Sequence, residues 1–292
     1  MTKSKNVLVT GAGGPSGKAA MQALKNKGFR VIAVDMVPVD HCADVFVRVL
    51  PALDPAFAEQ LDELFCTYEI AWFFPTVQEE LVLVAERAAM YRSRGIAVYM
   101  ASPAAVAICN DKWLTAQSLM AAGVAVPNSA IGDPGSAEVM PLGFPCISKP
   151  RIGRGGRQVV VHDGPHTECV GNNLVWQEFM PGTEYDVLLM IQPNQPMRTM
   201  VATVFEKTSL REGRTGNALE VVRVSVPDVC ELALSAVKAL NLVGPLDMDI
   251  RRDSNGVAHI LEINARIGAN TQKAPEIFDA LVELYEKGDL GG

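Results

Sequence analysis

Short apolar runs alternate with amphipathic stretches over the first hundred residues. Apolar residues at consecutive or alternate positions predict strands, and apolar residues three and four positions apart predict helices. On this basis we expect strands at 6–10, 30–35, 69–75 and 96–102, and helices at 18–28, 55–68 and 79–95. Strands that alternate with helices indicate β-α-β units, with a parallel sheet and helices on both of its faces.

The pattern changes after residue 108. Residues 102–127 predict two short helices that end at Pro127, and short strands interrupted by glycine predict a small α+β lobe up to about residue 180. Longer strands follow, and the predicted elements beyond them are a helix at 227–242, a hairpin that turns at 253–256, and a helix at 274–288. The predicted domains are therefore 1–108, 109–183 and 184–292.

Charge and composition exclude several classes of protein. The 292 residues carry 26 Lys and Arg against 33 Asp and Glu, a net charge of −7 with no basic run, which argues against a nucleic-acid binder. No apolar stretch reaches the roughly 18 residues of a membrane span, and the N-terminus does not resemble a signal peptide. Six cysteines without a Cys-x-x-Cys pair indicate reduced thiols. We expect a cytoplasmic protein with no membrane or nucleic-acid partner.

A glycine loop follows the first predicted strand and suggests a nicotinamide cofactor. Gly11, Gly14 and Gly17 have the spacing of short-chain dehydrogenases, and Asp35 ends the second strand, where an acid can bind a ribose. The same spacing also occurs wherever a strand turns tightly into a helix. None of the five tyrosines has a lysine four positions later, so the catalytic Tyr-x-x-x-Lys pair of those enzymes is missing.

Three later segments together predict a site for a nucleotide and a metal. Lys149 ends a strand before Gly153, Gly155 and Gly156, a loop that can close over phosphates. Glu184 follows a Pro-Gly turn. Asp249 lies on one strand of the predicted hairpin, and Glu262 and Asn264 lie on one face of the other, with Asp247 as an alternative to Asp249. Carboxylates with an amide oxygen suit Mg²⁺.

These segments resemble the ATP-grasp superfamily, most closely its carbamoyl-phosphate synthetase and biotin carboxylase branch. The segments VTGAGGPSGKAAMQAL, ADVFVRVLPALDPAF and CNDKWLTAQSLMAAGVAVP extend the resemblance over nearly the whole chain. It implies an α/β protein in which a Rossmann-like pre-ATP-grasp domain precedes a two-lobed α+β ATP-grasp domain. The glycine loop would then face the substrate and not a dinucleotide.

The resemblance also implies roles for individual residues. For ATP, it implies Lys112, Lys149, Gly153, Gly155, Gly156, Gln177, Glu178, Met180, Glu184, Lys207 and Arg211, with Arg214 nearby. Adenine would meet the backbone of Glu178 and Met180, and Glu184 would hold the ribose. Two Mg²⁺ ions, replaceable by Mn²⁺, would bind Asp249, Glu262 and Asn264. Arg266 and Lys149 would be catalytic, and the substrate would meet Gly13, Gly14, Pro15, Glu79, Arg266 and Gly268.

The implied reaction is a carboxylate–amine ligation. A small carboxylate attacks the γ-phosphate of ATP, and an amine displaces phosphate from the acyl phosphate. The alternatives are a phosphotransferase that stops at a carboxyl or carbamoyl phosphate, a dehydrogenase, and a catalytically silent nucleotide-binding protein. The segment 162–174 is shorter than in the family and predicts a trimmed lid lobe. A homodimer is a further expectation from the family.

Overall fold

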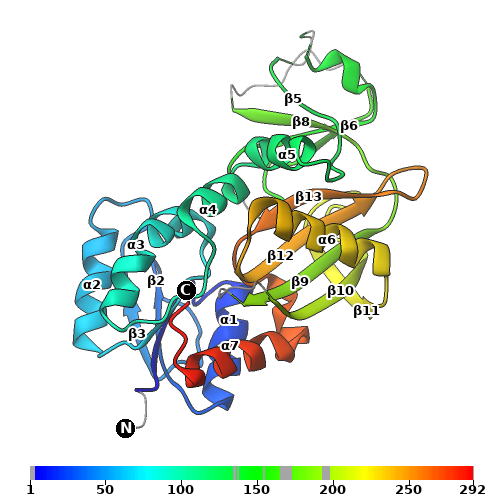
Figure 1. Cartoon of the computed structure of the whole chain (residues 1–292). Helices are drawn as coiled ribbons and strands as arrows, with labels where there is room; N and C mark the ends of the chain where they lie inside the picture. The colour runs from blue at the N-terminus through cyan, green and yellow to red at the C-terminus, as the bar shows by residue number, and fades with distance from the viewer. Residues whose placement is uncertain are drawn as a thin grey trace.

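The computed structural model describes residues 4–133, 136, 138–153, 155–164, 173–192 and 198–291. These residues fold into a mixed α/β structure built on three sheets (Figure 1). Most predicted elements are present, with ends that shift by a few residues. The shortened segment predicted at 162–174 falls largely outside the described residues.

A four-stranded sheet with its helices forms the N-terminal part. Its strands run parallel in the order β3-β2-β1-β4, which confirms the parallel sheet. The strands are β1 (Asn6–Thr10), β2 (Arg30–Asp35), β3 (Val45–Arg48) and β4 (Trp72–Phe74). The helices are α1 (Pro15–Asn26), α2 (Phe57–Thr67), the 3-10 turn η1 (Gln78–Glu80) and α3 (Leu81–Ser93).

The strand predicted at 96–102 is wrong as a regular strand. Ala97 makes an isolated parallel bridge to Trp72, and the N–H of Val98 donates to the carbonyl of Leu290 at the other end of the chain, at 2.9 Å. Phe73 donates its N–H to the carbonyl of Ala97, but Pro75, two residues later, has no N–H to donate. The apolar run IAVYM is therefore buried without extending the ladder. A pattern of buried residues does not reveal which partner its backbone will find.

Two linker helices lead to the small lobe, α4 (Pro103–Asn110) and α5 (Lys112–Ala121). Asp111 caps α5 by accepting from the N–H groups of Trp113 and Leu114. The lobe is an antiparallel sheet in the order β5-β8-β6-β7. Its elements are β5 (Ser129–Ile131), η2 (Met140–Leu142), β6 (Cys146–Pro150), β7 (Val160–His162) and β8 (Leu174–Glu178).

A five-stranded antiparallel sheet forms the C-terminal part, in the order β11-β10-β9-β12-β13. It contains β9 (Glu184–Gln192), β10 (Arg198–Leu210), β11 (Ala218–Val224), β12 (Gly244–Arg252) and β13 (Ala258–Asn264). Around it lie α6 (Pro227–Leu240), η3 (Ala269–Lys273) and α7 (Pro275–Lys287). Strands β12 and β13 form the predicted hairpin.

The two faces of this sheet bury different helices. On β9, Val187, Leu189 and Ile191 share a core cluster with residues of α6, whereas Leu188 and Met190 share another with α7 and the N-terminal sheet. Because side chains alternate along a strand, Glu184 and Asp186 point to the face opposite α6. The packing of β9 therefore decides which face carries the polar residues.

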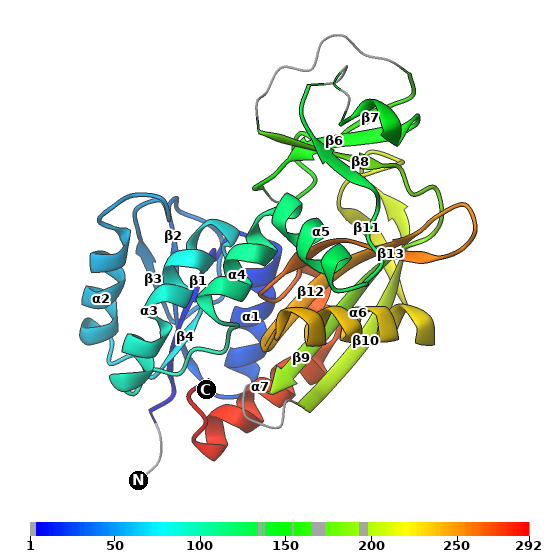
Figure 2. The ribbon, with the colours of Figure 1, turned by 45° about the horizontal axis from the view of Figure 1, so that its top comes forward.

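The hydrophobic core runs across the boundary predicted at residue 108. Tyr285 of α7 stacks on Trp72 of β4 with ring centroids 5.0 Å apart, and α7 also contacts β9 and β10. In Figure 2 the chain end returns beside the N-terminal sheet, while the small lobe projects away from both larger sheets. The N-terminal sheet and the five-stranded sheet thus pack into a common hydrophobic core.

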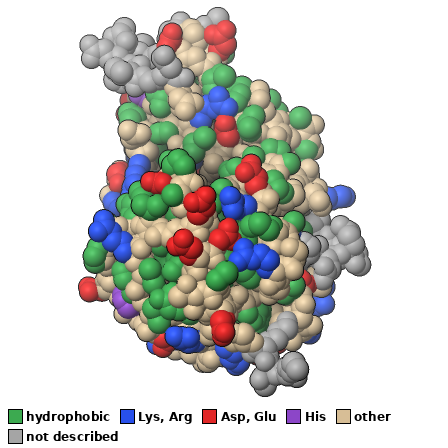
Figure 3. Space-filling view, turned by 90° about the vertical axis from the view of Figure 1, so that its left-hand side faces the viewer, with side chains coloured by type: hydrophobic (Ala, Val, Ile, Leu, Met, Phe, Trp, Pro, Cys, Tyr) green, Lys and Arg blue, Asp and Glu red, His purple; other side chains and the backbone are tan. Residues whose placement is uncertain are grey.

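The surface carries charges of both signs. On the face in Figure 3, acidic and basic side chains are interspersed among apolar and neutral ones. None of the helices that the structure describes has both the length and the apolar character needed to cross a membrane. Cys42, Cys66, Cys109 and Cys230 are free thiols; Cys169 lies outside the described residues.

Candidate active site

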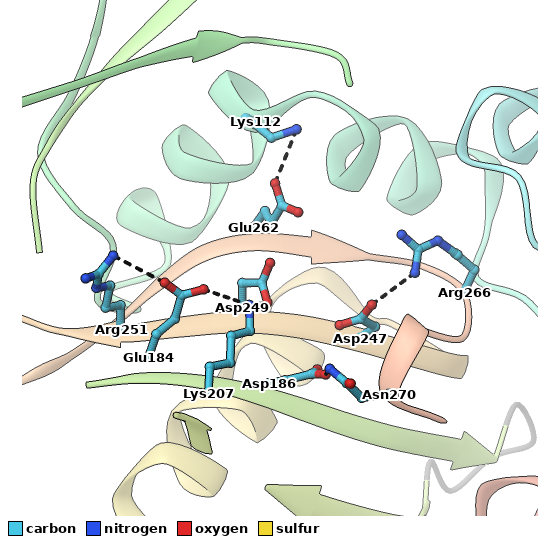
Figure 4. Close-up of polar contacts among 10 residues, drawn as sticks. All are labelled: Lys112, Glu184, Asp186, Lys207, Asp247, Asp249, Arg251, Glu262, Arg266 and Asn270. Atoms are coloured by element: carbon cyan, nitrogen blue, oxygen red, sulfur yellow. Dashed lines mark hydrogen bonds and ion pairs between the residues drawn. The ribbon is translucent and has the colours of Figure 1, made fainter. Parts of the chain in front are cut away.

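A pocket lies between the small sheet and the five-stranded sheet, with walls from α5, β6 and β8 and from β9, β10, β12 and β13. Segments far apart in the sequence therefore meet there, as Figure 4 shows for its charged residues. Most of the predicted nucleotide and metal residues line it: Lys112, Lys149, Gly153, Gly156, Gln177, Glu178, Met180, Glu184, Lys207, Asp249 and Glu262.

A row of acidic side chains crosses three neighbouring strands beneath this pocket. Asp249 of β12 pairs in register with Glu262 of β13 on one side and with Asp186 of β9 on the other. Asp247 pairs with Asn264. The prediction that Glu262 and Asn264 share one face of their strand is confirmed, and the register places Asp249 and Asp247 opposite them.

Asp186 is an acid that the sequence analysis missed. Its side chain is 2% exposed, among strand residues that are otherwise buried and apolar. The signal was present, because Glu184 and Asp186 are two positions apart on one strand and must share a face. A buried carboxylate in an apolar strand is costly unless a partner or ligand meets it.

Lys207 is the cation that holds two of these acids together. Its Nζ donates to Glu184 Oε1 at 2.7 Å and to Asp249 Oδ1 at 2.5 Å. Burial opposes the charge of this lysine, but the neighbouring carboxylates of Asp249 and Glu184 raise its pKa well above the usual value. Arg251 adds an ion pair to Glu184 Oε2 at 3.3 Å. Glu184, the predicted ribose ligand, is thus fixed by two cations.

Two lysines approach the acidic row from the other side. Lys112 lies 3.3 Å from Glu262 Oε2 and donates to the carbonyl of Gly153 at 2.8 Å. Lys149 donates to the carbonyl of Leu261 at 3.2 Å, and burial lowers its pKa to about 8. Burial opposes ionisation of Glu262, yet the charges of Lys112 and Lys149 lower its pKa to about 2.

The pKa values of Asp249 and Asp186 are raised, in contrast to that of Glu262. Burial raises the pKa of Asp249 to about 7, despite the charge of Lys207. Burial, together with the neighbouring Asp247, raises the pKa of Asp186 well above its usual range. A bound cation stabilises carboxylates whose ionisation is opposed by burial. The donor set of carboxylates and one amide oxygen fits Mg²⁺.

The second glycine-rich loop, Gly153 to Gly156, lines the pocket only in part. Gly153 and Gly156 line it, whereas Gly155 is outside the lining and lies next to Asn217. The side chain of Arg211, a predicted ATP contact, is exposed and lies outside the pocket lining. The sequence analysis missed several lining residues. Arg157 follows the loop from Gly153 to Gly156, and the turn after β10 supplies Thr215, Gly216 and Asn217.

The strand β8 and the residues after it form one wall of the pocket. Gln177 donates to Ser129 Oγ at 3.0 Å, and the N–H of Glu178 donates to the carbonyl of Asn128 at 2.9 Å. The N–H of Glu178 is therefore already satisfied within the protein. Glu178 and Met180 remain in the pocket wall, and Met180 is almost fully buried.

The predicted substrate residues fall into two groups that pack together through α1 and η3. In the first group, Arg266 pairs with Asp247 at 3.0 Å, and Gly268 packs so closely that a Cβ there would lie 2.2 Å from an Asp247 oxygen. The second group is the glycine loop, Gly13, Gly14 and Pro15, together with Glu79 of η1. The N–H of Gly13 donates to Asp35 Oδ2 at 2.9 Å.

Comparison with solved structures shows the same fold in several enzymes. The L-amino acid ligase from Bacillus licheniformis matches with a TM-score of 0.71 and 18% identity, over 91% of this chain and 68% of that one. The biotin carboxylase from Campylobacter jejuni gives 0.69 and 16%, over 98% and 70%. The N5-carboxyaminoimidazole ribonucleotide synthetase from Thermotoga maritima gives 0.63 and 21%, over 89% and 68%.

Comparison of the sequence with curated proteins and with family models gives one match. No curated protein matched the chain. A family model described as an ATP-grasp domain matches residues 109–270, which are more than half of the chain and include every acid of the row and all three pocket lysines. The chain therefore belongs to the ATP-grasp domain family.

Proposed function

We propose that this protein is an ATP-dependent ligase that activates a small carboxylate as an acyl phosphate and joins it to an amine, releasing ADP and phosphate. The observation that carries the proposal is the meeting of Lys112, Lys149 and Lys207 with the acidic row of β12 and β13 in one pocket. A polyanion with a divalent cation matches both sets of charges.

The nucleotide would lie along the wall formed by β8, with adenine near Met180 and the ribose at Glu184. Lys112 and Lys149 would bind phosphate oxygens, and the loop from Gly153 to Gly156 would cover them with backbone N–H groups. Lys207 would exchange one of its carboxylate partners for phosphate. This exchange leaves its charge in place, because the pKa of Lys207 is already well above the usual value.

Asp249, Glu262 and Asn264 would hold two Mg²⁺ ions, with Mn²⁺ as a substitute. When bound, these ions neutralise phosphate charge during phosphoryl transfer. A neighbouring fold from Hydrogenobacter thermophilus is described as a dimer in complex with MgADP and bicarbonate. We extend that nucleotide, metal and homodimer to this chain as proposals.

Arg266 would steady the carboxylate and the acyl phosphate. Its guanidinium is oriented by Asp247 and by the carbonyl of Ile267, at 3.0 and 2.7 Å. Charge neutralisation and positioning account for most of the catalysis in such transfers, so a side-chain nucleophile is unnecessary. Closure of the loop from Gly153 to Gly156 would keep water from the reactive acyl phosphate.

The N-terminal part would be the Rossmann-like pre-ATP-grasp domain, ending near residue 108, with further boundaries near 183. In support, its strand order β3-β2-β1-β4 is that of half a doubly wound sheet. Gly13, Gly14 and Pro15 would then face the substrate. The loop suits this role better than dinucleotide binding, because Asp35 already accepts the Gly13 N–H.

Calorimetric titration tests the proposal against its alternatives. We expect Mg·ADP to bind the wild type, to bind at least tenfold more weakly to Lys149→Ala and to Glu262→Gln, and NADPH to give no heat. Arg211→Ala is the matched control, since its exposed side chain lies outside the pocket and should leave ADP affinity unchanged. Binding of NADPH without ADP would favour the dehydrogenase.

Trapping with hydroxylamine then separates ligase from phosphotransferase. Candidate carboxylic acids are incubated with Mg·ATP, and the hydroxamate is measured with and without an amine. Amide formed in proportion to ADP supports the ligase. An acyl or carbamoyl phosphate that accumulates while the amine is left unreacted would show that the enzyme stops at the first step.

A further inference from the structure

Three aspartates converge on one point beside the proposed magnesium ligands. Asp186 of β9 and Asp247 and Asp249 of β12 each offer a carboxylate oxygen, and these oxygens all lie within 4.8 Å of one another. The strands are hydrogen-bonded neighbours, with Asp249 in register with Asp186. The convergence is therefore fixed by the sheet and not by a loop (Figure 4).

Each of these carboxylates has one oxygen held by a different side chain. The contacts are Asn270 Nδ2 to Asp186 Oδ2 at 2.7 Å, Arg266 Nη1 to Asp247 Oδ2 at 3.0 Å, and Lys207 Nζ to Asp249 Oδ1 at 2.5 Å. Outer contacts of this kind orient metal ligands in proteins. They fix the three carboxylates while using one oxygen of each.

The second oxygen of Asp186 has no partner. Its Oδ1 is buried and receives no hydrogen bond from any residue that the structure describes, and the side chain as a whole is 2% exposed. A buried carboxylate oxygen without a donor carries a large desolvation cost, so buried acceptors are nearly always satisfied. An Asp186 oxygen also lies within 4.8 Å of oxygens of Asp247 and Asp249, so a cation among the three carboxylates would meet this side chain.

We propose that Asp186, Asp247 and Asp249 form a second site for a divalent cation, Mg²⁺ or Mn²⁺, distinct from the ions held by Glu262 and Asn264. Asp249 lies between the two sets and belongs to both. Three hard carboxylate oxygens, with no thiol or imidazole among them, suit hard divalent ions such as these. The catalytic use of this ion rests on the proposed function, but its binding does not.

A bare ion fits this position better than a cationic group of the substrate. The Asp186 Oδ1 atom is closed to solvent, so a bulky cationic group cannot reach it from outside without displacing protein atoms. An ion held by three carboxylates also needs no phosphate to complete its main ligands, unlike ions carried in with ATP. The site should therefore bind its ion before the nucleotide arrives.

Mn²⁺ titration of the full chain without nucleotide, followed by electron paramagnetic resonance, tests the inference. We expect the wild type to bind one Mn²⁺ ion tightly. Asp186→Asn, which retains the shape and the contact with Asn270, should weaken that ion at least tenfold. Asp247→Asn should do the same. Glu262→Gln is the matched control: it should keep this ion, because Glu262 lies on the other side of Asp249.

The outcomes separate the two proposals. Failure of the wild type to bind Mn²⁺ without nucleotide, or equal binding by wild type and Asp186→Asn, would overturn the second site. Loss of the ion in Glu262→Gln would assign it to the nucleotide metals and would also overturn it. Mg·ADP calorimetry on the same samples reports the proposed function separately, and circular dichroism confirms that each variant is folded.

Discussion

Facing residues of this site differ in their ionisation because of their neighbours. Asp249 and Glu262 are opposite one another on β12 and β13, yet burial raises the pKa of the first to about 7 while Lys112 and Lys149 hold that of the second, against burial, at about 2. Lys112 and Lys149 lie beside β13, so the acid on β13 is ionised more readily than the acid opposite it on β12. Asp249 is the acid that most needs a cation.

Replacing Lys207 tests how far Asp249 depends on a neighbouring cation. Lys207→Met removes the cation shared by Glu184 and Asp249, and breaking a buried ion pair costs about 3–5 kcal/mol of unfolding free energy. We expect a loss of that size at pH 8, measured by urea unfolding. The loss should shrink near pH 5, because Asp249 takes up a proton, and Mg²⁺ should restore part of it. A loss that is equal at both pH values would contradict this account.

Glu80 provides a separate prediction about pH. Its Oε1 accepts from Thr10 and from the N–H groups of Thr76 and Val77, and burial raises its pKa from 4.5 to about 7. The folded protein therefore binds more protons than the unfolded chain between these values, so stability is full below about pH 4.5 and falls as pH rises to about 7. The slope contributed is at most about 1.4 kcal/mol per pH unit.

Glu80→Gln should remove this slope. Glutamine keeps the oxygen that accepts all three hydrogen bonds but does not titrate. Unfolding free energies measured between pH 4.5 and 8 should therefore show a flatter profile for the variant, with the gain in stability largest above pH 7. If wild type and variant give parallel profiles, Glu80 does not titrate in this window.

At the scale of elements, the glycine loop is explained by packing. A Cβ on Gly17 in the first turn of α1 would lie 2.1 Å from the Gly11 carbonyl oxygen, whereas one on Gly14 would lie 3.4 Å from it. Gly11 itself has φ +63, a conformation that favours glycine. Close approach of α1 to the end of β1 thus requires two of these glycines whether or not a ligand binds.

Alanine substitutions should separate these positions. Gly17→Ala should destabilise the protein by about 1–3 kcal/mol or more, because the clash is with backbone that cannot move aside. Gly14→Ala, at the N-cap of α1, should cost well under half as much. Thermal or urea unfolding of both variants measures the difference. Equal losses would show that the approach of α1 to β1 is not the constraint.

At the scale of the whole molecule, the small lobe has much less core than the rest. Its buried cluster consists of Ala130, Val139, Cys146 and Trp176, whereas the other two clusters span the N-terminal sheet, both faces of the five-stranded sheet, α6 and α7. Stability within a protein follows such differences in burial. The two larger sheets should therefore unfold together, and the small lobe should open first.

Hydrogen exchange read by mass spectrometry measures this order. Amides of β5, β6 and β8 should exchange about tenfold faster or more than those of β9 and β12, since a tenfold difference corresponds to about 1.4 kcal/mol in opening free energy. Mg·ADP should slow exchange at β6 and β8, which form a wall of the pocket. Peptides spanning β1 and α7 should exchange at matching rates, as their shared core requires.

The sequence predicted the elements well where periodicity was long and failed where pairing was not local. The strands β9 to β13 and the helices α6 and α7 lie close to their predicted positions, and Glu262 and Asn264 share a face because side chains alternate along a strand. Residues 96–102 did not form the predicted strand, because their pairing with β4 ends after one bridge, at Ala97. Arg211 was placed in the pocket by resemblance alone, and its turn directs the side chain to solvent.

The sequence by itself determined the local structure, the faces of the strands and the family to which the chain belongs, because these depend on residues a few positions apart or on motifs in order. The tertiary structure decided which charges meet. Asp186, Lys207 and Arg251 come from separate strands, and their contacts with Glu184 and Asp249 follow from sheet register and burial. Register depends on how whole faces pack, which no single segment specifies.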